Sequence, residues 1–191
     1  MRIGIDIDDT ITNTYKKVIK ILSSNNGIDF NLLYNLNLSY DELLLRFGNC
    51  MKLTRENYTF VAKNVELKED VLEVLNEVSK DNEIIVITAR NNIDYGNPYL
   101  LSKNYLDSKG IKYNELHVGV SDKGKFCSEN NIDLFIDDNI KNCEMVKLYG
   151  IDVLLYDNVF NKKSDLKRVN NWNEILEYVR RVQNGWKSSY Q

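Results

Sequence analysis

Residues 2–10 read RIGIDIDDT, an apolar stretch that ends in two carboxylates, Asp6 and Asp8, and a hydroxyl, Thr10. The alternating isoleucines are typical of a buried β-strand. The charges begin where such a strand should stop, so we expect them to project into the space beyond its C-terminal edge. Two carboxylates this close would repel each other in a dry setting, which indicates a shared cation. The pattern suits a phosphorylated substrate and a magnesium ion.

The same residues also have an ordinary structural interpretation. Asp and Thr after a strand commonly form an Asx-turn or cap the next helix. Alone, the motif is therefore moderate evidence for a site. It gains weight because two later strands also end in polar side chains that could serve the same chemistry.

The composition indicates one sizeable domain with room for a small insertion. The 191 residues carry a net charge of −3 and no basic stripe, which argues against a nucleic acid polymer as the main partner. No apolar run is long enough to span a bilayer and there is no room for a signal peptide before the first strand, so we expect a cytoplasmic protein without a membrane partner. Cys50, Cys127 and Cys143 lack the spacing of a zinc site, and we expect reduced thiols. The sequence leaves a homo-oligomer open.

From residue 68 onward, strand and helix patterns alternate. Apolar runs predict strands at 83–88, 116–120, 133–136 and 152–156. Helical spacing predicts a helix between each pair and a last helix over 171–182. Strands separated by single helices predict an α/β fold, a three-layer Rossmann-like parallel sheet with right-handed crossovers.

Residues 13–65 break this alternation. They contain no convincing strand but three helix-like stretches, at 15–22, 40–47 and 55–62. A small all-helical insertion directly after the first strand would lie over the C-terminal end of that strand. We therefore divide the chain into a core, residues 1–12 and 66–191, and a cap segment, residues 13–65.

Polar side chains recur at the predicted C-terminal ends of the strands. Asp6 and Asp8 follow the first strand, Thr88 ends the second, and Asp137 and Asp138 follow a later one. Ligands of parallel α/β sheets bind beyond these ends. The sequence therefore predicts that residues far apart in the chain converge on one edge of the sheet.

Taken in order, these motifs resemble the four motifs of the haloacid dehalogenase-like phosphatases. DIDDT resembles the first motif, Thr88 in ITAR the second, Lys123 in SDKGKFC the third, and Asp137 with Asp138 in FIDDN the fourth. The resemblance covers the whole core. Within the superfamily, the chain is most similar to the 5'(3')-deoxyribonucleotidases and their bacterial relatives.

The resemblance implies an aspartyl-phosphate mechanism. Asp6 would attack phosphorus as the nucleophile, and water would then hydrolyse the intermediate. Asp8 would protonate the leaving oxygen and later deprotonate the water, so we expect its carboxyl to be neutral in the first step, beside a second carboxylate. Asp6, the main-chain carbonyl of Asp8, and Asp137 would bind Mg²⁺. Thr10 and Asp138 would support the site.

Four residues are expected to bind the substrate phosphate: Thr88, Ala89, Arg90 and Lys123. Thr88 can donate its hydroxyl and Ala89 its main-chain amide. Arg90 could bind phosphate bidentately or pair with an acidic loop. Lys123 is preferred over Lys125 because it lies just before a helix, where a long side chain can reach over the sheet edge.

Other residues have competing interpretations. Asp137 and Asp138 could instead cap a helix over 139–148, and Asp138 could bind a metal-bound water or orient Lys123. His117, the single histidine, is expected to be structural.

Substrate specificity should lie in the cap segment, where we expect one or two aromatic side chains to contact the ligand. The candidates are Tyr15, Phe30, Tyr34, Tyr40, Phe47, Tyr58 and Phe60. The cap segment does not align with that of the mammalian enzymes, and Asp9 stands where they carry glycine. Both departures leave the nucleotide preference open.

The sequence thus predicts a Mg²⁺-dependent phosphomonoesterase, a hydrolase that dephosphorylates a (deoxy)ribonucleoside monophosphate. A phosphatase for another small metabolite, such as a sugar phosphate, is an alternative that a purely polar cap would favour. A non-catalytic nucleotide- or phosphate-binding module is a third hypothesis, although such a protein would typically have lost Asp6 or Asp8.

Overall fold

The computed structural model describes residues 1–47 and 54–189. Its centre is a six-stranded sheet with the order β3-β2-β1-β4-β5-β6, and every pairing between these strands is parallel. The strands are β1 (Arg2–Ile5), β2 (Glu83–Thr88), β3 (Glu115–Val118), β4 (Leu134–Asp137), β5 (Asp152–Tyr156) and β6 (Arg168–Val169). The predicted α/β fold with a parallel sheet is confirmed.

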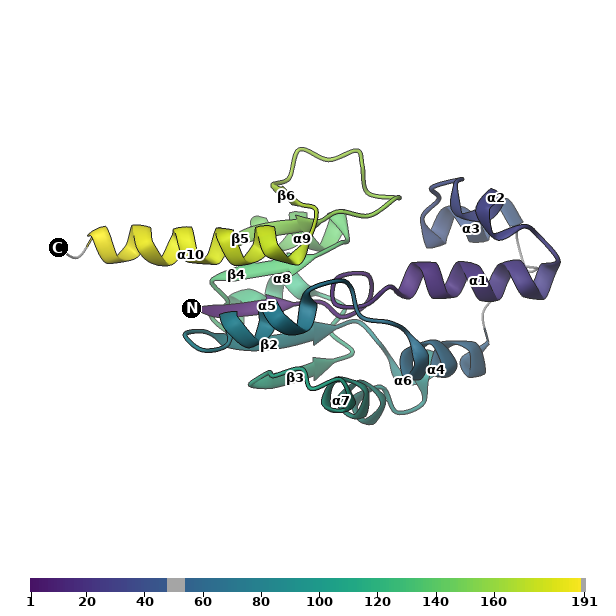
Figure 1. Ribbon diagram of the computed structural model, residues 1–191, viewed down its shortest axis with the longest axis horizontal. Helices are drawn as coiled ribbons and strands as arrows, with labels where there is room; N and C mark the ends of the chain where they lie inside the picture. Colours follow the sequence, from purple (N-terminus) through teal and green to yellow (C-terminus); the bar gives the residue numbers. More distant parts are fainter. Residues whose placement is uncertain (48–53, 190–191) are drawn as a thin grey trace.

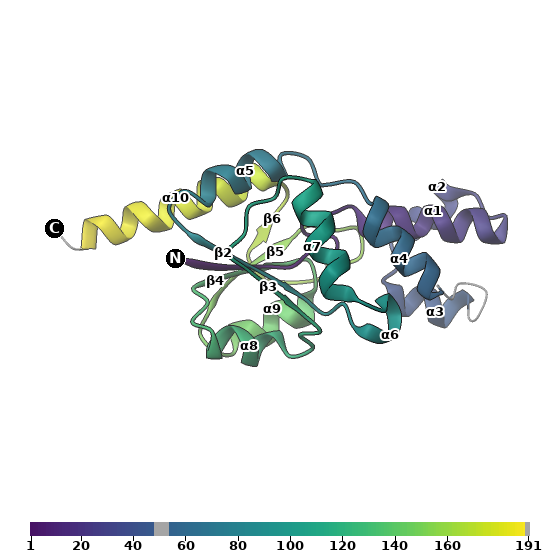
Figure 2. The same cartoon turned by 90° about the horizontal axis from the view of Figure 1, so that it is seen from below.

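Helices cover both faces of the sheet (Figure 2). One face carries α5 (Val71–Val78), α7 (Pro98–Ser108) and α10 (Trp172–Ser189), and the other α8 (Lys123–Glu129) and α9 (Ile140–Lys147). Alternate strand residues point to opposite faces. Accordingly, Ile84 and Val86 of β2 belong to one core cluster, whereas Ile85 and Ile87 pack with Cys127 and Cys143 of α8 and α9 in the other.

The local signals in the sequence set most element boundaries. The side chain of Asn97 accepts a hydrogen bond from the Leu100 amide at 2.9 Å, which caps α7 in front of Pro98. Three short elements were not predicted: α2 (Phe30–Tyr34), α6 (Asn92–Tyr95) and the two-residue β6. Elements this short give no periodic pattern that a sequence can display. The last helix, α10, extends seven residues beyond the predicted end at residue 182, to Ser189.

The cap segment contains four described helices. They are α1 (Thr14–Asn26), α2, α3 (Tyr40–Phe47) and α4 (Arg55–Asn64). The chain leaves and re-enters the core side by side, because Asn13 donates its amide to Glu66 and Lys68 donates its amide to Ile11, both at 2.9 Å. The helices lie beyond the end of the sheet to which the β1 arrow points (Figure 1). We propose that this segment acts as a cap over the strand ends.

Cys127 and Cys143 are buried free thiols, as predicted, whereas Cys50 lies outside the described residues. Burial raises the pKa of Cys127 to about 12, so its thiol stays protonated. Among the described helices, none is both long and apolar enough to cross a membrane.

The packing of α8 on α9 can be tested at Gly124. A Cβ added there would lie 2.8 Å from the main-chain oxygen of Met145 in α9, so one helix would have to shift. Gly124→Ala should therefore lower the free energy of unfolding by about 1–3 kcal/mol.

The matched control is Gly185→Ala, because an added Cβ in α10 meets nothing within 4 Å. This change should leave the stability unchanged or raise it by up to about 1 kcal/mol. Urea denaturation of the two variants measures the difference. Equal effects in both would contradict the close approach of α8 to α9.

Candidate active site

The C-terminal ends of β1, β2 and β4 open into one cavity of about 280 Å³. The predicted site residues that line it are Asp6, Asp8, Thr88, Ala89, Arg90, Lys123, Asp137 and Asp138. Thr10 is the one predicted site residue that does not line the cavity. The predicted residues that line the cavity therefore come from four separate parts of the chain and meet at one edge of the sheet, as expected.

The register of the sheet brings the first two carboxylates together. Ile5 pairs with Ile136, and the Asp6 amide donates to the Ile136 oxygen at 3.0 Å. Asp6 and Asp137, the next residues along each strand, therefore emerge side by side. Both are buried, with 6% and 1% of their surface exposed.

Lys123 lies between these two carboxylates. Its ammonium group donates to Asp6 Oδ1 and, at 2.7 Å, to Asp137 Oδ2. The side chain is 2% exposed, whereas that of Lys125 is exposed, with its Nζ 3.8 Å from Glu129. As expected, Lys123 rather than Lys125 reaches the cavity.

The cavity holds more negative than positive charge. Burial raises the pKa of Asp6 to about 7; Lys123 opposes this rise, and Asp137 reinforces it. Burial and the neighbouring Asp9 also raise the pKa of Asp138 well above its usual range. These carboxylates would ionise fully at neutral pH only with a further cation beside them.

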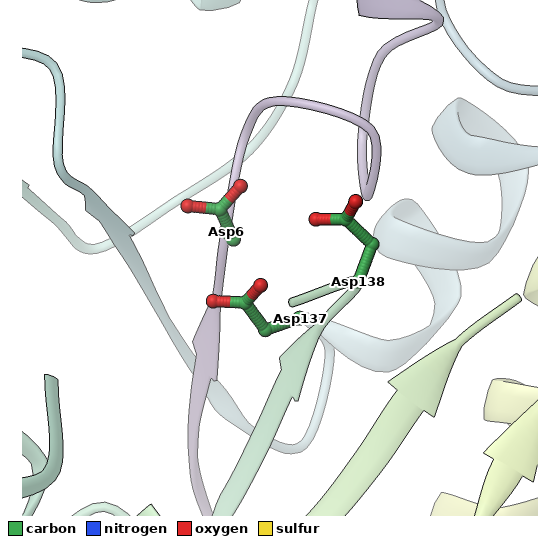
Figure 3. Close-up of side chains that lie close together, drawn as sticks. All are labelled: Asp6, Asp137 and Asp138. Carbon is green, nitrogen blue, oxygen red and sulfur yellow. The ribbon is translucent and has the colours of Figure 1, made fainter. Parts of the chain in front are cut away.

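Three carboxylates form a cluster that could hold such a cation. One oxygen from each of Asp6, Asp137 and Asp138 lies within 4.8 Å of the others (Figure 3). Oxygen ligands of this kind suit Mg²⁺. The expected ligands Asp6 and Asp137 are both in the cluster, and Asp138, expected in a supporting role, joins them.

The helix-cap interpretation of Asp137 and Asp138 is wrong. Asn139 caps α9, its side chain accepting from the Asn142 amide at 3.1 Å. Asp137 instead accepts from the Asn139 amide at 2.8 Å and from the Asn142 side chain at 2.9 Å. Asp137, and not Asp138, also orients Lys123, while the Asp138 carboxylate accepts from Asn158 at 3.4 Å.

Arg90 pairs with Asp8, the second of its two expected alternatives. Its Nε and Nη2 donate to the two Asp8 oxygens at 2.8 and 2.7 Å, and its Nη1 donates to Ser102 at 3.2 Å. Burial alone would raise the pKa of Asp8, but Arg90 and the Thr14 hydroxyl outweigh burial and lower it. The arginine therefore stabilises the ionised form of Asp8 in the free protein. Our expectation of a neutral Asp8 concerns the first catalytic step and stays a prediction.

The remaining predicted residues divide between the cavity and the core. Thr88 accepts the Arg90 amide at 3.3 Å, which leaves its own hydroxyl proton to donate. Ala89 is exposed at the cavity wall. The expectation that Thr10 projects toward the ligand is wrong. Thr10 is fully buried, its hydroxyl has no hydrogen-bond partner among the described residues, and its carbonyl accepts from Trp172 at 3.1 Å.

Tyr40 and Tyr58 are the cap-segment aromatics that line the cavity. Of the other cap-segment candidates, Tyr15 is buried in the core and Phe30 stacks on Tyr34. Phe60 is half-exposed, and the side chain of Phe47 is not among the described ones. Tyr95 in α6 and Phe160 after β5 also line the cavity, and we did not predict either. The rule that ligands bind in loops after parallel strands could have found both.

His117 lies outside the cavity lining. Its Nε2 is 2.8 Å from Glu115, and its ring packs on Phe126 with centroids 4.7 Å apart. These contacts agree with the structural role that we expected.

Comparison with known proteins agrees with this geometry. A family model described as "5' nucleotidase, deoxy (Pyrimidine), cytosolic type C protein" matches residues 1–184. A nucleotidase of Clostridium acetobutylicum is 28% identical over 194 residues, which cover 95% of each chain.

Solved structures of low identity share the fold. A HAD-hydrolase of Bacillus subtilis, described as bound to magnesium, superposes with a TM-score of 0.63 at 12% identity, over 94% of this chain and 98% of that one. A β-phosphoglucomutase of Clostridium difficile gives a TM-score of 0.58 at 17% identity, over 98% of both chains. The chain thus has the fold of the haloacid dehalogenase-like hydrolases and belongs to the cytosolic type C family of 5' nucleotidases.

Proposed function

We propose that the protein is a Mg²⁺-dependent phosphomonoesterase that hydrolyses nucleoside monophosphates through a phosphorylated Asp6. The observation that carries this proposal is the buried Lys123 between Asp6 and Asp137. Lys123 binds Oδ1 of Asp6, so the other carboxylate oxygen is left to attack phosphorus. Covalent catalysis of this kind divides one difficult displacement into two easier steps.

The carboxylate cluster fits the cofactor that this chemistry requires. We assign Asp6, Asp137 and the main-chain carbonyl of Asp8 as Mg²⁺ ligands, and add Asp138 because it completes the cluster. When bound, the ion would screen the repulsion between the nucleophile and the phosphate dianion. Lys123, the Thr88 hydroxyl and the Ala89 amide would hold the phosphoryl oxygens.

Asp8 and Arg90 would handle the proton as a pair. Arg90 keeps Asp8 ionised in the free protein and fixes its orientation through two hydrogen bonds. An arriving phosphate dianion competes for the guanidinium and adds negative charge, and both effects raise the pKa of Asp8. Asp8 could then protonate the leaving oxygen, and after that group departs it could deprotonate the attacking water.

A nucleoside leaving group suits the remaining walls of the cavity. Tyr40, Tyr58, Tyr95 and Phe160 offer aromatic surfaces beside the phosphate-binding end. Aromatic rings of this kind offer flat apolar faces on which a planar base could stack. The family description, which names a deoxy (pyrimidine) nucleotidase of cytosolic type, supports this substrate class and a cytoplasmic location.

The two other hypotheses fit less well. A sugar phosphate has no planar base to stack on the four aromatic side chains that line the cavity. A non-catalytic binding module would not need the nucleophile and the acid–base residue, yet Asp6 and Asp8 both line the cavity.

Phosphate release tests the proposed reaction. With Mg²⁺, we expect turnover of nucleoside monophosphates to exceed that of sugar phosphates, and a chelator should abolish it. Asp6→Asn should lose at least about 1,000-fold in kcat, because no nucleophile remains. Faster hydrolysis of sugar phosphates would favour the metabolite phosphatase. A folded, Mg²⁺-loaded protein that hydrolyses none of these esters would contradict the nucleotidase.

The role of Lys123 is tested by a pair of lysine variants. Lys123→Met removes the cation between Asp6 and Asp137 and should lower kcat by about 100- to 1,000-fold. Lys125→Met removes a charge from the same helix but only from its exposed face, so kcat should stay within about twofold of wild type. Steady-state kinetics on folded protein separates the two. Equal loss in both variants would rule out a specific role for Lys123.

A further inference from the structure

Asp9 is a buried acidic residue that the proposed mechanism does not use. It follows Asp8 in the loop between β1 and α1, residues 6–13, which we call the catalytic loop. It is 3% exposed and has a backbone φ of +61°. This left-handed region favours glycine, although Asp and Asn tolerate it better than other residues do. A strained, buried aspartate persists only where its side chain makes contacts that glycine could not make.

Both carboxylate oxygens of Asp9 bind the cap segment. Oδ1 accepts the main-chain amide of Tyr15, at the start of α1, at 2.7 Å. Oδ2 accepts the hydroxyl of Tyr40, the first residue of α3, at 3.1 Å. The hydroxyl of Tyr15 in turn donates to the Leu38 carbonyl, just before α3, at 2.7 Å. Asp9 therefore connects the catalytic loop to two helices of the cap segment.

Tyr40 lies at the boundary between two cavities. A second cavity of about 320 Å³ adjoins the first, and Tyr40 and Phe160 line both. The Tyr40 ring packs edge-on against Tyr15, with centroids 5.5 Å apart, and lies 6.1 Å from that of Phe160. The Tyr40 ring therefore forms part of the boundary between the cavity at the strand ends and the second cavity.

We propose that Asp9 is a positioning residue that holds Tyr40 and the start of α3 against the catalytic loop, and so determines which leaving groups the site accepts. This inference rests on the proposed phosphatase function. Asp9 acts through Tyr40 and does not touch the reacting atoms. A planar leaving group packs against the Tyr40 ring, so loosening that ring weakens binding of the substrate more than it slows the chemical step.

Three substitutions separate positioning from general stability. Asp9→Gly relieves the strained φ but removes both hydrogen bonds, and Tyr40→Phe removes only the hydroxyl. Asp9→Asn tolerates the same φ, can accept from the Tyr15 amide through Oδ1, and can donate from Nδ2 to the Tyr40 hydroxyl. Tyr34→Phe is a matched control, because Tyr34 belongs to the cap segment but not to the lining of either cavity.

The kinetic readout is KM against kcat for nucleoside monophosphates. Asp9→Gly and Tyr40→Phe should each raise KM at least about fivefold, with kcat within about twofold, because both variants lose the hydrogen bond between Asp9 and Tyr40. The double variant should be no worse than Asp9→Gly, because both changes break the same contact. In Asp9→Asn, KM should stay near the wild-type value. In Asp9→Gly and Tyr40→Phe, KM should increase more for nucleoside monophosphates than for methyl phosphate.

Hydrogen–deuterium exchange of residues 39–47 tests the contact without turnover. Exchange should be faster in Asp9→Gly and Tyr40→Phe than in wild type, and unchanged in Asp9→Asn and Tyr34→Phe. Unchanged exchange in the first two variants would overturn the positioning role, as would faster exchange with unchanged KM. A wild-type protein that hydrolyses no phosphate ester would overturn the proposed function, and the exchange experiment would still decide whether Asp9 holds α3.

Discussion

The site depends on one interaction, the contact of a buried ammonium group with two buried carboxylates. The sheet register forces Asp6 and Asp137 to emerge side by side from adjacent strands. Two ionised carboxylates in that position would be costly without compensating charge. The first residue of α8, Lys123, supplies it. Because α8 packs tightly on α9 at Gly124, the main chain that carries Lys123 is held in place, and the two carboxylates orient its side chain.

Charge balance explains how the rest of the cavity is organised. Lys123 donates hydrogen bonds to Asp6 and Asp137, and Arg90 donates to Asp8, so each cation balances carboxylate charge. The Asp138 carboxylate accepts one long hydrogen bond, from the Asn158 amide at 3.4 Å, and its pKa is raised. The proposed Mg²⁺ would balance the remaining negative charge, and a phosphate dianion would then enter a site with enough cations to hold it. Binding of the proposed Mg²⁺ and of the substrate would thus be linked through the same carboxylates.

The fold was largely predictable because its signals are local. The apolar runs that form β2 and β5 were predicted at their observed bounds, and residues from three strand ends converge on one cavity as expected. The errors concern side chains whose partners lie far away in sequence. The sequence left two alternatives for Arg90 and could not decide that it pairs with Asp8, and nothing near Thr10 indicates that it would face the core beneath Trp172. Tyr95 and Phe160 were missed because we looked for aromatic walls only in the cap segment.

The central claim is that Asp6 is phosphorylated during turnover. Rapid acid quenching of the Mg²⁺-loaded protein with a nucleoside monophosphate, followed by peptide mass spectrometry, tests it directly. Our account predicts a phosphoryl group on Asp6 that forms only with substrate and decays as substrate is exhausted. Phosphate release with no modified Asp6, or with the phosphoryl group on a different residue, would contradict it.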